Sequence, residues 1–489
     1  MIDILWSKMN EVFSVKKCSM YINGGWIGND LPQIEVINPA NEEVIAHIPK
    51  GGKIEADNAV EAAYNAFGTW SRLTADRRSK LLTNWFLLVE KEAEAIAELI
   101  TLEQGKPFKE ALNEVLYANS FINWYAEEGK RVYGETIPSS SENKRIVVQK
   151  QPVGVVAAIT PWNFPAAMIT RKVSPALAAG CTVVIKPAES TPLTAFKLAE
   201  LAEKAGIPAG VINVVTGDPQ EIVDAWMKDE RVRKITFTGS TEVGKKLMRG
   251  AAETVKLVSL ELGGNAPFIV MGDADLTKTI NGIVNSKFRN AGQTCVCTNR
   301  IYVHESLIQT FTEKLIDAVR RLKVGEGIDR TTEIGPLINR SAVEKVQRLI
   351  EDAKAKGGRV LLGGDIPSNE KGFFIEPTII ADANDEMVCM KEEVFGPVAS
   401  IAVFRDEEEV IKRANSTPYG LAAYVFTENL GGAIRICEQL EFGIIGLNDG
   451  APSTAQAPFG GFKESGLGRE GGHYGIDEFL EVKYISISL

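Results

Sequence analysis

Residues 154–187 have the sequence GVVAAITPWNFPAAMITRKVSPALAAGCTVVIKP, and their pattern indicates the architecture. The apolar run at 155–159 predicts a strand, and 167–179 predicts a helix that Gly180 ends. A second apolar run at 182–185 predicts the next strand. Strands that are apolar throughout and alternate with helices of this length are typical of a parallel sheet covered by helices on both faces.

The same alternation extends on both sides of this stretch. It continues to residue 262, and a second series runs from Asp273 to about Asn448, so we predict two Rossmann-like, doubly wound α/β domains. Thr191 is expected to cap a helix that starts at Pro192 and ends before Gly206. The other predicted helices are 55–70, 76–104, 108–128, 219–229, 241–252, 275–290, 305–322, 341–356, 406–414 and 430–440. The other predicted strands are a hairpin at 21–26, then 211–215, 234–238, 257–262, 300–303, 421–426 and two near 359 and 399.

Two segments outside the alternation are predicted to be extended. Residues 131–151 are rich in Thr, Ser, Val and Ile around a polar tip at 139–143, which indicates a long two-stranded excursion. The apolar run at 479–487 predicts a terminal strand. We expect 131–151 to form a small β oligomerisation arm and 470–489 to end in the terminal strand. Both suggest a homodimer or homotetramer.

Composition limits the classes of function. A chain of 489 residues exceeds the size at which one hydrophobic core keeps growing, so two or three domains are expected. Its 54 Lys and Arg residues against 64 Asp and Glu give a net charge of -10, which repels phosphate backbones and anionic lipid. We therefore expect no nucleic-acid partner and no membrane partner.

The N-terminal residues and the cysteines indicate the cellular compartment in which the protein is expected. Residues 1–15 carry acidic side chains among the apolar ones and do not predict a signal peptide. No run approaches the ~20 apolar residues of a membrane span. The six cysteines are scattered along the chain, which suits reduced thiols. A cytoplasmic protein is the expectation.

Two glycine-containing stretches are candidates for binding a phosphate. Residues 466–471 match the dinucleotide pattern G-x-G-x-x-G, but no apolar strand precedes them and too little chain follows, so we expect a hinge or loop. The better candidate is 237–244, where an apolar strand passes through Gly239 and Ser240 into a helix. A helix start offers free N–H groups to an anion, although the same turn is compatible with a purely structural role.

Six local signatures occur in one order, namely TPWNFP at 160–165, KPAE at 186–189, FTGSTEVG at 237–244, ELGGN at 261–265, GQTC at 292–295 and EEVFGP at 392–397. Together they resemble the aldehyde dehydrogenase superfamily over essentially the whole chain. Within it, Arg171, residues 288–297 and residues 451–453 are similar to succinate-semialdehyde dehydrogenases. The resemblance implies an NAD(P)-binding domain at 1–130 with 152–263 and a catalytic domain at 264–463.

Cys295 is the predicted nucleophile. An aldehyde cannot simply lose hydride, because an acylium ion would result, whereas addition of a thiolate gives a tetrahedral alkoxide that expels hydride readily. The resemblance assigns the donors to this alkoxide to the Asn163 side-chain amide and the backbone N–H of Cys295. Glu261 would then activate water to release the carboxylic acid from the thioester.

The resemblance also implies the cofactor contacts. These are Lys186 at the adenosine ribose, Trp162 and Ser240 near the pyrophosphate, Glu393 at the nicotinamide ribose, and Phe395 against the nicotinamide. A carboxylate at Glu189 would accept hydrogen bonds from ribose hydroxyls and repel a 2′-phosphate, so we predict NAD in preference to NADP.

The substrate prediction rests on arginine. Its planar guanidinium suits a carboxylate, and Arg289 lies six residues before Cys295. The resemblance implies that Arg171, Arg289 and Ser453 hold the carboxylate of succinate semialdehyde. Glutarate semialdehyde differs by one methylene, worth only about 1–3 kcal/mol in a pocket, so it and other aldehydes remain alternatives.

Other enzyme classes compete with this interpretation. A cysteine hydrolase would need a histidine base, for which the chain offers His47, His304 and His473, but it does not explain the double α/β alternation. A CoA-acylating enzyme would release its acyl group to a thiol, whereas Glu261 favours water.

Cys297 lies two residues from the predicted nucleophile. Two thiols fall short of the four ligands that zinc prefers, so we expect no metal site. A reversible Cys295–Cys297 disulfide would be strained and is a hypothesis that peroxide inactivation of a Cys297→Ala protein would test.

Overall fold

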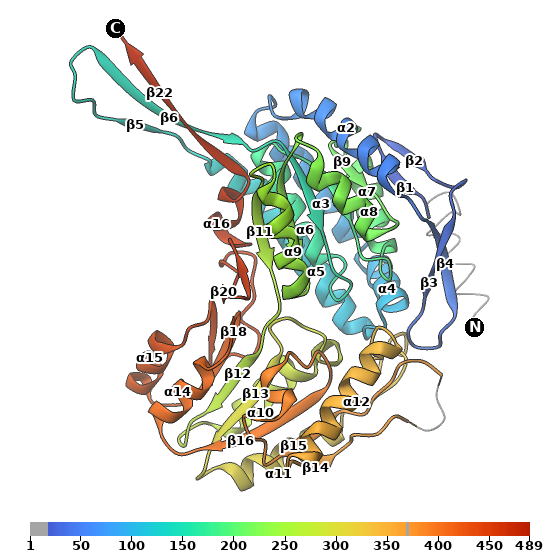
Figure 1. Cartoon of the computed structure of the whole chain (residues 1–489), viewed down its shortest axis with the longest axis vertical. Coiled ribbons are helices and arrows are strands. Elements are labelled where there is room, and N and C mark those ends of the chain that lie inside the picture. Colours follow the sequence, from blue (N-terminus) through green and yellow to red (C-terminus); the bar gives the residue numbers. More distant parts are fainter. Residues whose placement is uncertain (1–17, 368–370) are drawn as a thin grey trace.

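A computed structural model of the protein describes residues 18–367 and 371–489. Two α/β lobes lie one above the other, and a narrow β arm extends from the N-terminal lobe (Figure 1). Each lobe is built on one sheet whose central strands are parallel. The predicted fold class of two Rossmann-like, doubly wound domains is confirmed.

The first sheet has eight strands. All of β8 and four of the five residues of β7 are buried, because helices cover both faces of a parallel sheet. The five central strands are parallel, and the three outer strands, β1, β2 and β21, are antiparallel to their neighbours. In spatial order the strands are β2 (Gly25–Ile27), β1 (Met20–Ile22), β9 (Ile212–Val214), β8 (Thr182–Lys186), β7 (Val155–Ile159), β10 (Val232–Thr238), β11 (Leu257–Glu261) and β21 (Gly466–Leu467).

Eight helices of the first lobe surround this sheet in the described residues. The helix predicted at 76–104 is two helices, because Glu92 has non-helical φ and ψ of −104° and 17°. The helix predicted to start at Pro192 starts at Leu193, with Pro192 as its N-cap. The eight are α2 (Lys53–Trp70), α3 (Ala75–Lys91), α4 (Ala93–Gln104), α5 (Phe108–Glu128), α6 (Ala167–Ala179), α7 (Leu193–Lys204), α8 (Pro219–Lys228) and α9 (Thr241–Ala252).

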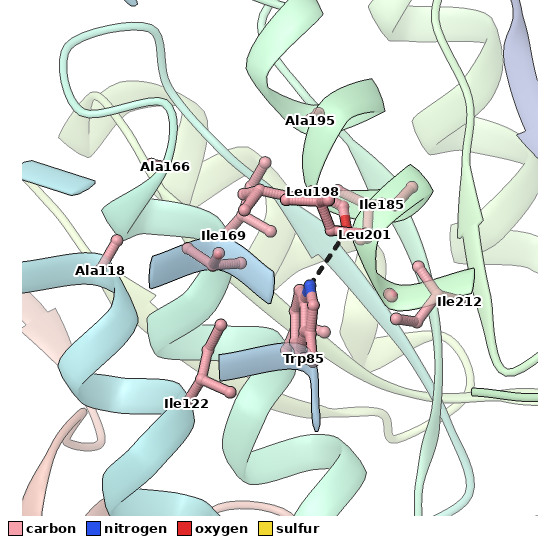
Figure 2. Packing of buried hydrophobic residues seen from close by; sticks show 14 of the residues in the cluster. Trp85, Ala118, Ile122, Ala166, Ile169, Ile185, Ala195, Leu198, Leu201 and Ile212 are labelled. Carbon is pink, nitrogen blue, oxygen red and sulfur yellow. Dashed lines mark hydrogen bonds between the residues drawn. The ribbon is translucent and has the colours of Figure 1, made fainter. Parts of the chain in front are cut away.

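Trp85 on α3 is at the centre of the core between these helices and the sheet. Its ring is buried, and its indole N–H donates to the backbone oxygen of Leu198 on α7 at 3.1 Å (Figure 2). Ile122 of α5 and Ile169 of α6 belong to the same buried cluster. The indole N–H of this large buried side chain therefore has a hydrogen-bond partner, as burial requires.

The second sheet has seven strands, of which only β14 is antiparallel to its neighbour. In spatial order they are β14 (Arg359–Leu362), β15 (Thr378–Ala381), β16 (Val398–Phe404), β13 (Thr298–His304), β12 (Ala266–Val270), β18 (Ala422–Phe426) and β19 (Ile444–Leu447). The helices of this lobe include α10 (Leu276–Ile283), α11 (Ile308–Arg320), α12 (Arg340–Ala355), α13 (Val388–Lys391), α14 (Glu407–Asn415) and α15 (Leu430–Gln439).

This lobe differs from the prediction at β12 and at the helix that follows it. The central strand β12 was not predicted, and Pro267 within it would ordinarily argue against a strand in the middle of a sheet. A shift in the β12–β13 register next to Pro267 accommodates the missing N–H. The helix predicted at 275–290 leaves the α conformation after Ile283 and continues as a π-helical turn at Val284–Phe288.

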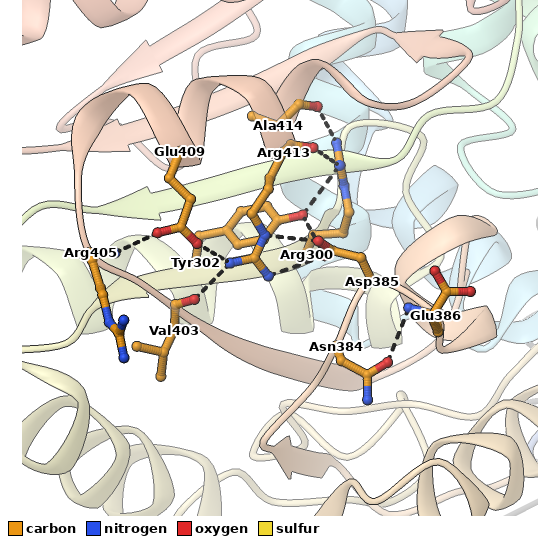
Figure 3. Close-up of polar contacts among 10 residues, drawn as sticks. All are labelled: Arg300, Tyr302, Asn384, Asp385, Glu386, Val403, Arg405, Glu409, Arg413 and Ala414. Carbon is orange, nitrogen blue, oxygen red and sulfur yellow. Dashed lines mark hydrogen bonds and ion pairs between the residues drawn. The ribbon is translucent and has the colours of Figure 1, made fainter.

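Arg300 on β13 is hydrogen-bonded to α14. Its guanidinium donates five hydrogen bonds, to Tyr302 Oη and to the backbone oxygens of Asn265, Arg413 and Ala414. Figure 3 shows those to Tyr302, Arg413 and Ala414. The Arg413 guanidinium donates hydrogen bonds to both carboxylate oxygens of Asp385. Because every Arg300 N–H is used within the lobe, this buried cation has a structural role.

The arm is a three-stranded antiparallel sheet in the order β22 (Leu480–Ser488), β6 (Lys144–Pro152) and β5 (Glu135–Ile137). The excursion and the terminal strand predicted separately are thus neighbours in one sheet. Several large apolar side chains on the arm are exposed, among them Tyr133, Val482, Tyr484 and Leu489.

Residues 466–471 have a different role from the one predicted. Gly466 and Leu467 form β21, which pairs with Leu260 and Glu261 at the edge of the first sheet, so the hinge or loop interpretation is wrong for these two residues. Glu470 of the same stretch is buried and forms ion pairs with Arg171 and Lys172. The first two residues of the glycine pattern therefore form the edge strand of the first sheet.

Residues 18–367 and 371–489 contain neither a membrane-spanning helix nor a metal-binding cluster. No helix there is long and apolar enough to cross a membrane. No group of three or more His, Cys, Asp or Glu side chains in that part of the chain is arranged to hold a metal ion.

Gly466 offers a test of the β11–β21 pairing. Its φ is 147°, and an added Cβ would lie 2.0 Å from the Leu260 backbone oxygen. We expect Gly466→Ala to lower the free energy of unfolding by roughly 1–3 kcal/mol through this clash, measured by denaturant titration. The control is Gly68→Ala in α2, where no atom lies within 4 Å and a gain of about 0.5–1 kcal/mol is expected. Equal effects of the two substitutions would contradict the prediction.

Candidate active site

Cys295 follows a strained turn between the π-helical turn and β13. Asn290 and Ala291 have φ values of 52° and 53°, a region that is costly for residues other than glycine. Gly292 follows at φ 75°, and a Cβ there would lie 2.2 Å from the Gly396 backbone oxygen. The local sequence can therefore adopt this conformation only if surrounding groups hold it.

Two side chains of the N-terminal lobe region hold this turn. Glu110 on α5 accepts the Asn290 backbone N–H at 2.7 Å. The Asn290 side chain donates to the Asn163 backbone oxygen at 3.0 Å, and the Asn163 side chain donates to the Gln293 backbone oxygen at 3.1 Å. These hydrogen bonds join the predicted amide donor to the turn that leads to the predicted nucleophile.

A buried ion pair supports Asn163 from the other side. Lys106 donates to the Asn163 backbone oxygen at 2.8 Å and pairs with Glu114, and both charged side chains are almost fully buried. Glu114 also accepts the backbone N–H groups of Ala166 and Ala167 at the start of α6. Sequence reasoning missed this pair, although acidic residues four apart on the inner face of α5 were a signal for it.

Two cavities meet at Cys295, which lines both. The first has a volume of about 350 Å³ and reaches the start of α9, where Ser240 caps the helix. It contains six of the predicted cofactor and oxyanion residues, namely Trp162, Asn163, Gly239, Ser240, Glu393 and Phe395. The Trp162 and Phe395 rings meet edge to face with their centroids 5.5 Å apart.

The second cavity has a volume of about 240 Å³. It contains the three predicted substrate residues, Arg171, Arg289 and Ser453, together with Cys295. Phe164, Met168 and Phe459 supply apolar walls. A cavity that combines these apolar walls with two guanidinium groups suits a short aliphatic chain that ends in an anion.

Both guanidinium groups have unused donors. Arg171 Nη2 and Arg289 Nε are buried and have no hydrogen-bond partner among the described residues. Arg171 also forms an ion pair with Glu470 at 2.7 Å and lies 3.9 Å above the Phe459 ring. Buried N–H groups without partners are costly, so these two mark a place for an acceptor.

Three predicted residues line neither cavity. Glu261 ends β11 with its carboxyl buried, and Lys186 and Glu189 form an ion pair where β8 ends. Burial, reinforced by the charge of Glu470, raises the pKa of Glu261 well above its ordinary value. A carboxyl group with a raised pKa can take a proton from water near neutral pH.

The Cys295 thiol is protonated in this arrangement. Burial raises the pKa of Cys295 to about 12, Arg171 opposes the increase, and Glu393 and Glu261 add to it. Cys297 is a free thiol that is buried 3.5 Å from the Lys287 ammonium. The disulfide between the two cysteines stays a prediction.

The first cavity presents groups that can bind a nicotinamide dinucleotide. The start of α9 offers free N–H groups to a pyrophosphate, and Glu393 offers a carboxylate to ribose hydroxyls. Glu393 accepts the Gly264 backbone N–H at 3.2 Å, and burial raises its pKa to about 7. The residues present fit such a group.

A histidine base for Cys295 is not found where the hydrolase alternative needs it. His304 ends β13, with Nδ1 2.7 Å from Ser306 Oγ and Nε2 3.0 Å from the Arg405 backbone oxygen. It lines neither cavity at Cys295. No histidine lines either cavity among the described residues, so the geometry does not support the hydrolase alternative.

Comparison with known proteins agrees with this geometry. The profile of the aldehyde dehydrogenase family matches residues 26–485. The chain is 53% identical over 469 residues to the NADP-dependent succinate-semialdehyde dehydrogenase of Escherichia coli, covering 96% of this chain and 97% of that protein. It is 53% identical over 470 residues to the glutarate-semialdehyde dehydrogenase of Pseudomonas putida, covering 96% and 97%. The crystal structure of Staphylococcus aureus betaine aldehyde dehydrogenase in complex with NAD matches with a TM-score of 0.96 at 38% identity, covering 99% of this chain and 97% of that one.

The raised pKa of Cys295 predicts slow alkylation in the absence of cofactor. We expect the iodoacetamide rate to increase about tenfold per pH unit from about pH 8 to about pH 10, because the thiolate is the reactive form. Glu393→Gln removes a charge that raises this pKa, so it should react several-fold faster at the same pH. Cys295→Ala is the control that identifies the reacting thiol. A rate that is already constant above about pH 8 would contradict the prediction.

Proposed function

Because the chain belongs to the aldehyde dehydrogenase family, we propose that it oxidises succinate semialdehyde to succinate with NAD(P) as the hydride acceptor. NAD(P)-dependent oxidation of an aldehyde is the activity of the family. The observation that carries the substrate assignment is the cavity on one side of Cys295, in which two guanidinium groups keep unpartnered N–H donors. Glutarate semialdehyde is the alternative, because a relative of equal identity is named for it.

In the first step, the Cys295 sulfur forms a bond to the aldehyde carbon and the carbonyl electron pair moves to oxygen. The thiol proton is released to solvent water before or during this addition, since the thiolate is the nucleophile. The Asn163 amide has a second N–H besides the one it donates to Gln293, and we assign this N–H and the Cys295 backbone N–H to the alkoxide.

When bound, NAD(P) accepts the hydride that the tetrahedral alkoxide expels, which leaves a Cys295 thioester. Ser240 and the start of α9 would hold its pyrophosphate, and Glu393 its nicotinamide ribose. We assign Trp162 to the pyrophosphate and Phe395 to the face of the nicotinamide, and their rings meet edge to face in this cavity. We assign Lys186 and Glu189, which lie outside this cavity, to the adenosine end.

In the last step, water attacks the thioester carbon, its proton passes to Glu261, and the C–S bond breaks to return the Cys295 thiolate. The raised pKa of Glu261 suits it to accept this proton near neutral pH. Glu261 has to turn from the buried position described here to reach that water, because it does not line the cavity with Cys295. This step yields the free acid, so no acyl transfer to a thiol cofactor is needed.

We keep NAD as the preferred cofactor. A carboxylate at Glu189 repels a 2′-phosphate, although its pairing with Lys186 reduces that repulsion. The E. coli relative is named for NADP, so the assay below includes both cofactors.

The remaining assignments concern organisation. We propose that 1–130 with 152–263 binds NAD(P) and that 264–463 carries the nucleophile. The exposed apolar side chains of the arm, 131–151 with 470–489, support a homodimer or homotetramer. The six free cysteines support a reducing, cytoplasmic setting, which cell fractionation can test.

The decisive assay follows the absorbance of the reduced nicotinamide with succinate semialdehyde, glutarate semialdehyde and butanal, each with NAD and with NADP. We expect Arg289→Ala and Arg171→Ala to raise KM for the two carboxylated aldehydes by about 30-fold or more and to change butanal little, because butanal has no carboxylate. Cys295→Ala should abolish turnover. Equal losses on butanal and succinate semialdehyde would refute the substrate assignment, and equal kcat/KM with the two cofactors would refute the NAD preference.

Subunit contact through the arm has a separate test. Val482 and Tyr484 are exposed on one face of β22, and Lys483 points to the other. We expect light scattering to give the mass of two or four chains, and Val482→Glu with Tyr484→Glu to lower it by burying charge at the contact. Lys483→Glu is the matched control. A wild-type mass of one chain would contradict the proposal.

A further inference from the structure

Tyr117 is a polar residue of the second cavity that the steps above leave without a role. It lies on α5 and lines the cavity with Arg171, Arg289 and Cys295. Its hydroxyl oxygen is buried and has no hydrogen-bond partner among the described residues. A hydroxyl buried without a partner is costly, so a group that is absent from the protein itself is expected to pair with it.

The ring of Tyr117 is held in place by its neighbours. It packs edge to face on Phe121, one turn along α5, with centroids 5.0 Å apart at 86°. Phe121 in turn lies under the Arg171 guanidinium, 5.7 Å from the ring centroid. The hydroxyl therefore has a fixed direction relative to Arg171, which is the condition for selecting a ligand by geometry.

The charges around the hydroxyl make it a donor. Burial raises the pKa of Tyr117, and Arg171 and Arg289 act against that increase. Both guanidinium groups are thus close enough to influence it, and the hydroxyl keeps its proton at neutral pH. A carboxylate offers about four acceptor positions on two oxygens, more than two guanidinium N–H groups fill.

We propose that the Tyr117 hydroxyl donates a hydrogen bond to the carboxylate of the substrate and is a specificity-determining residue of the anion site. The inference rests on the proposed function, since it needs a carboxylate between Arg171 and Arg289. Three elements then contribute donors to one anion: α5 through Tyr117, α6 through Arg171, and the turn before Cys295 through Arg289.

The test compares Tyr117→Phe with a tyrosine on the same helix. Tyr125 lies two turns further along α5, and its hydroxyl is also buried, but it lies against Gly475 and does not line the cavity. For Tyr117→Phe we expect kcat/KM for succinate semialdehyde to fall about tenfold or more, mostly through KM, because a hydrogen bond to a charged group is lost. The constant for inhibition by succinate should rise by a similar factor, whereas butanal should be oxidised as by the wild type. Tyr125→Phe should leave all three measurements unchanged.

Two results would overturn the inference. One is unchanged kinetics of Tyr117→Phe with succinate semialdehyde, and the other is an equal loss with butanal, which would make Tyr117 a packing residue. The wild-type enzyme separates this failure from failure of the proposed function. If the wild type prefers succinate semialdehyde to butanal and Tyr117→Phe does not alter that preference, only the role of Tyr117 is lost; without a wild-type preference, both are lost.

Discussion

The buried pair of Lys106 and Glu114 is the interaction on which the site depends. Lys106 holds the Asn163 backbone oxygen, and Glu114 holds the start of α6, which carries Arg171. Removing one member of a buried ion pair typically costs about 3–5 kcal/mol, because the other charge stays buried without a partner. One ion pair therefore fixes the position of the oxyanion amide and of a substrate arginine together. Glu110, four residues before Glu114 on the same helix, holds the turn that leads to Cys295.

The sequence was sufficient for the repeating parts of the fold. Apolar strands such as β7 and β8 were predicted with their helices, because burial on both faces leaves a continuous apolar run in the sequence. The residues around Cys295 were predicted because six short signatures occur together, and the structure brings most of them to two adjoining cavities. Their roles in the reaction remain proposals.

The remaining features depend on contacts between distant residues. β12 escaped prediction because Pro267 is unusual in a central strand, and only the register shift against β13 accommodates it. The strand at Gly466 was taken for a loop because pairing with Leu260 is invisible in two residues of sequence. Lys106, Glu110 and Tyr117 were missed because charged and polar side chains are usually solvated, and their contacts at the site come from residues distant in the sequence.

Cys295 lies at the junction of two cavities, which bears on how ligands and reagents reach its sulfur. The cavities proposed for the dinucleotide and for the aldehyde share this one lining residue, so each ligand can fill its own space and still meet the other at the sulfur. A reagent bonded to the sulfur itself therefore intrudes on both cavities at once.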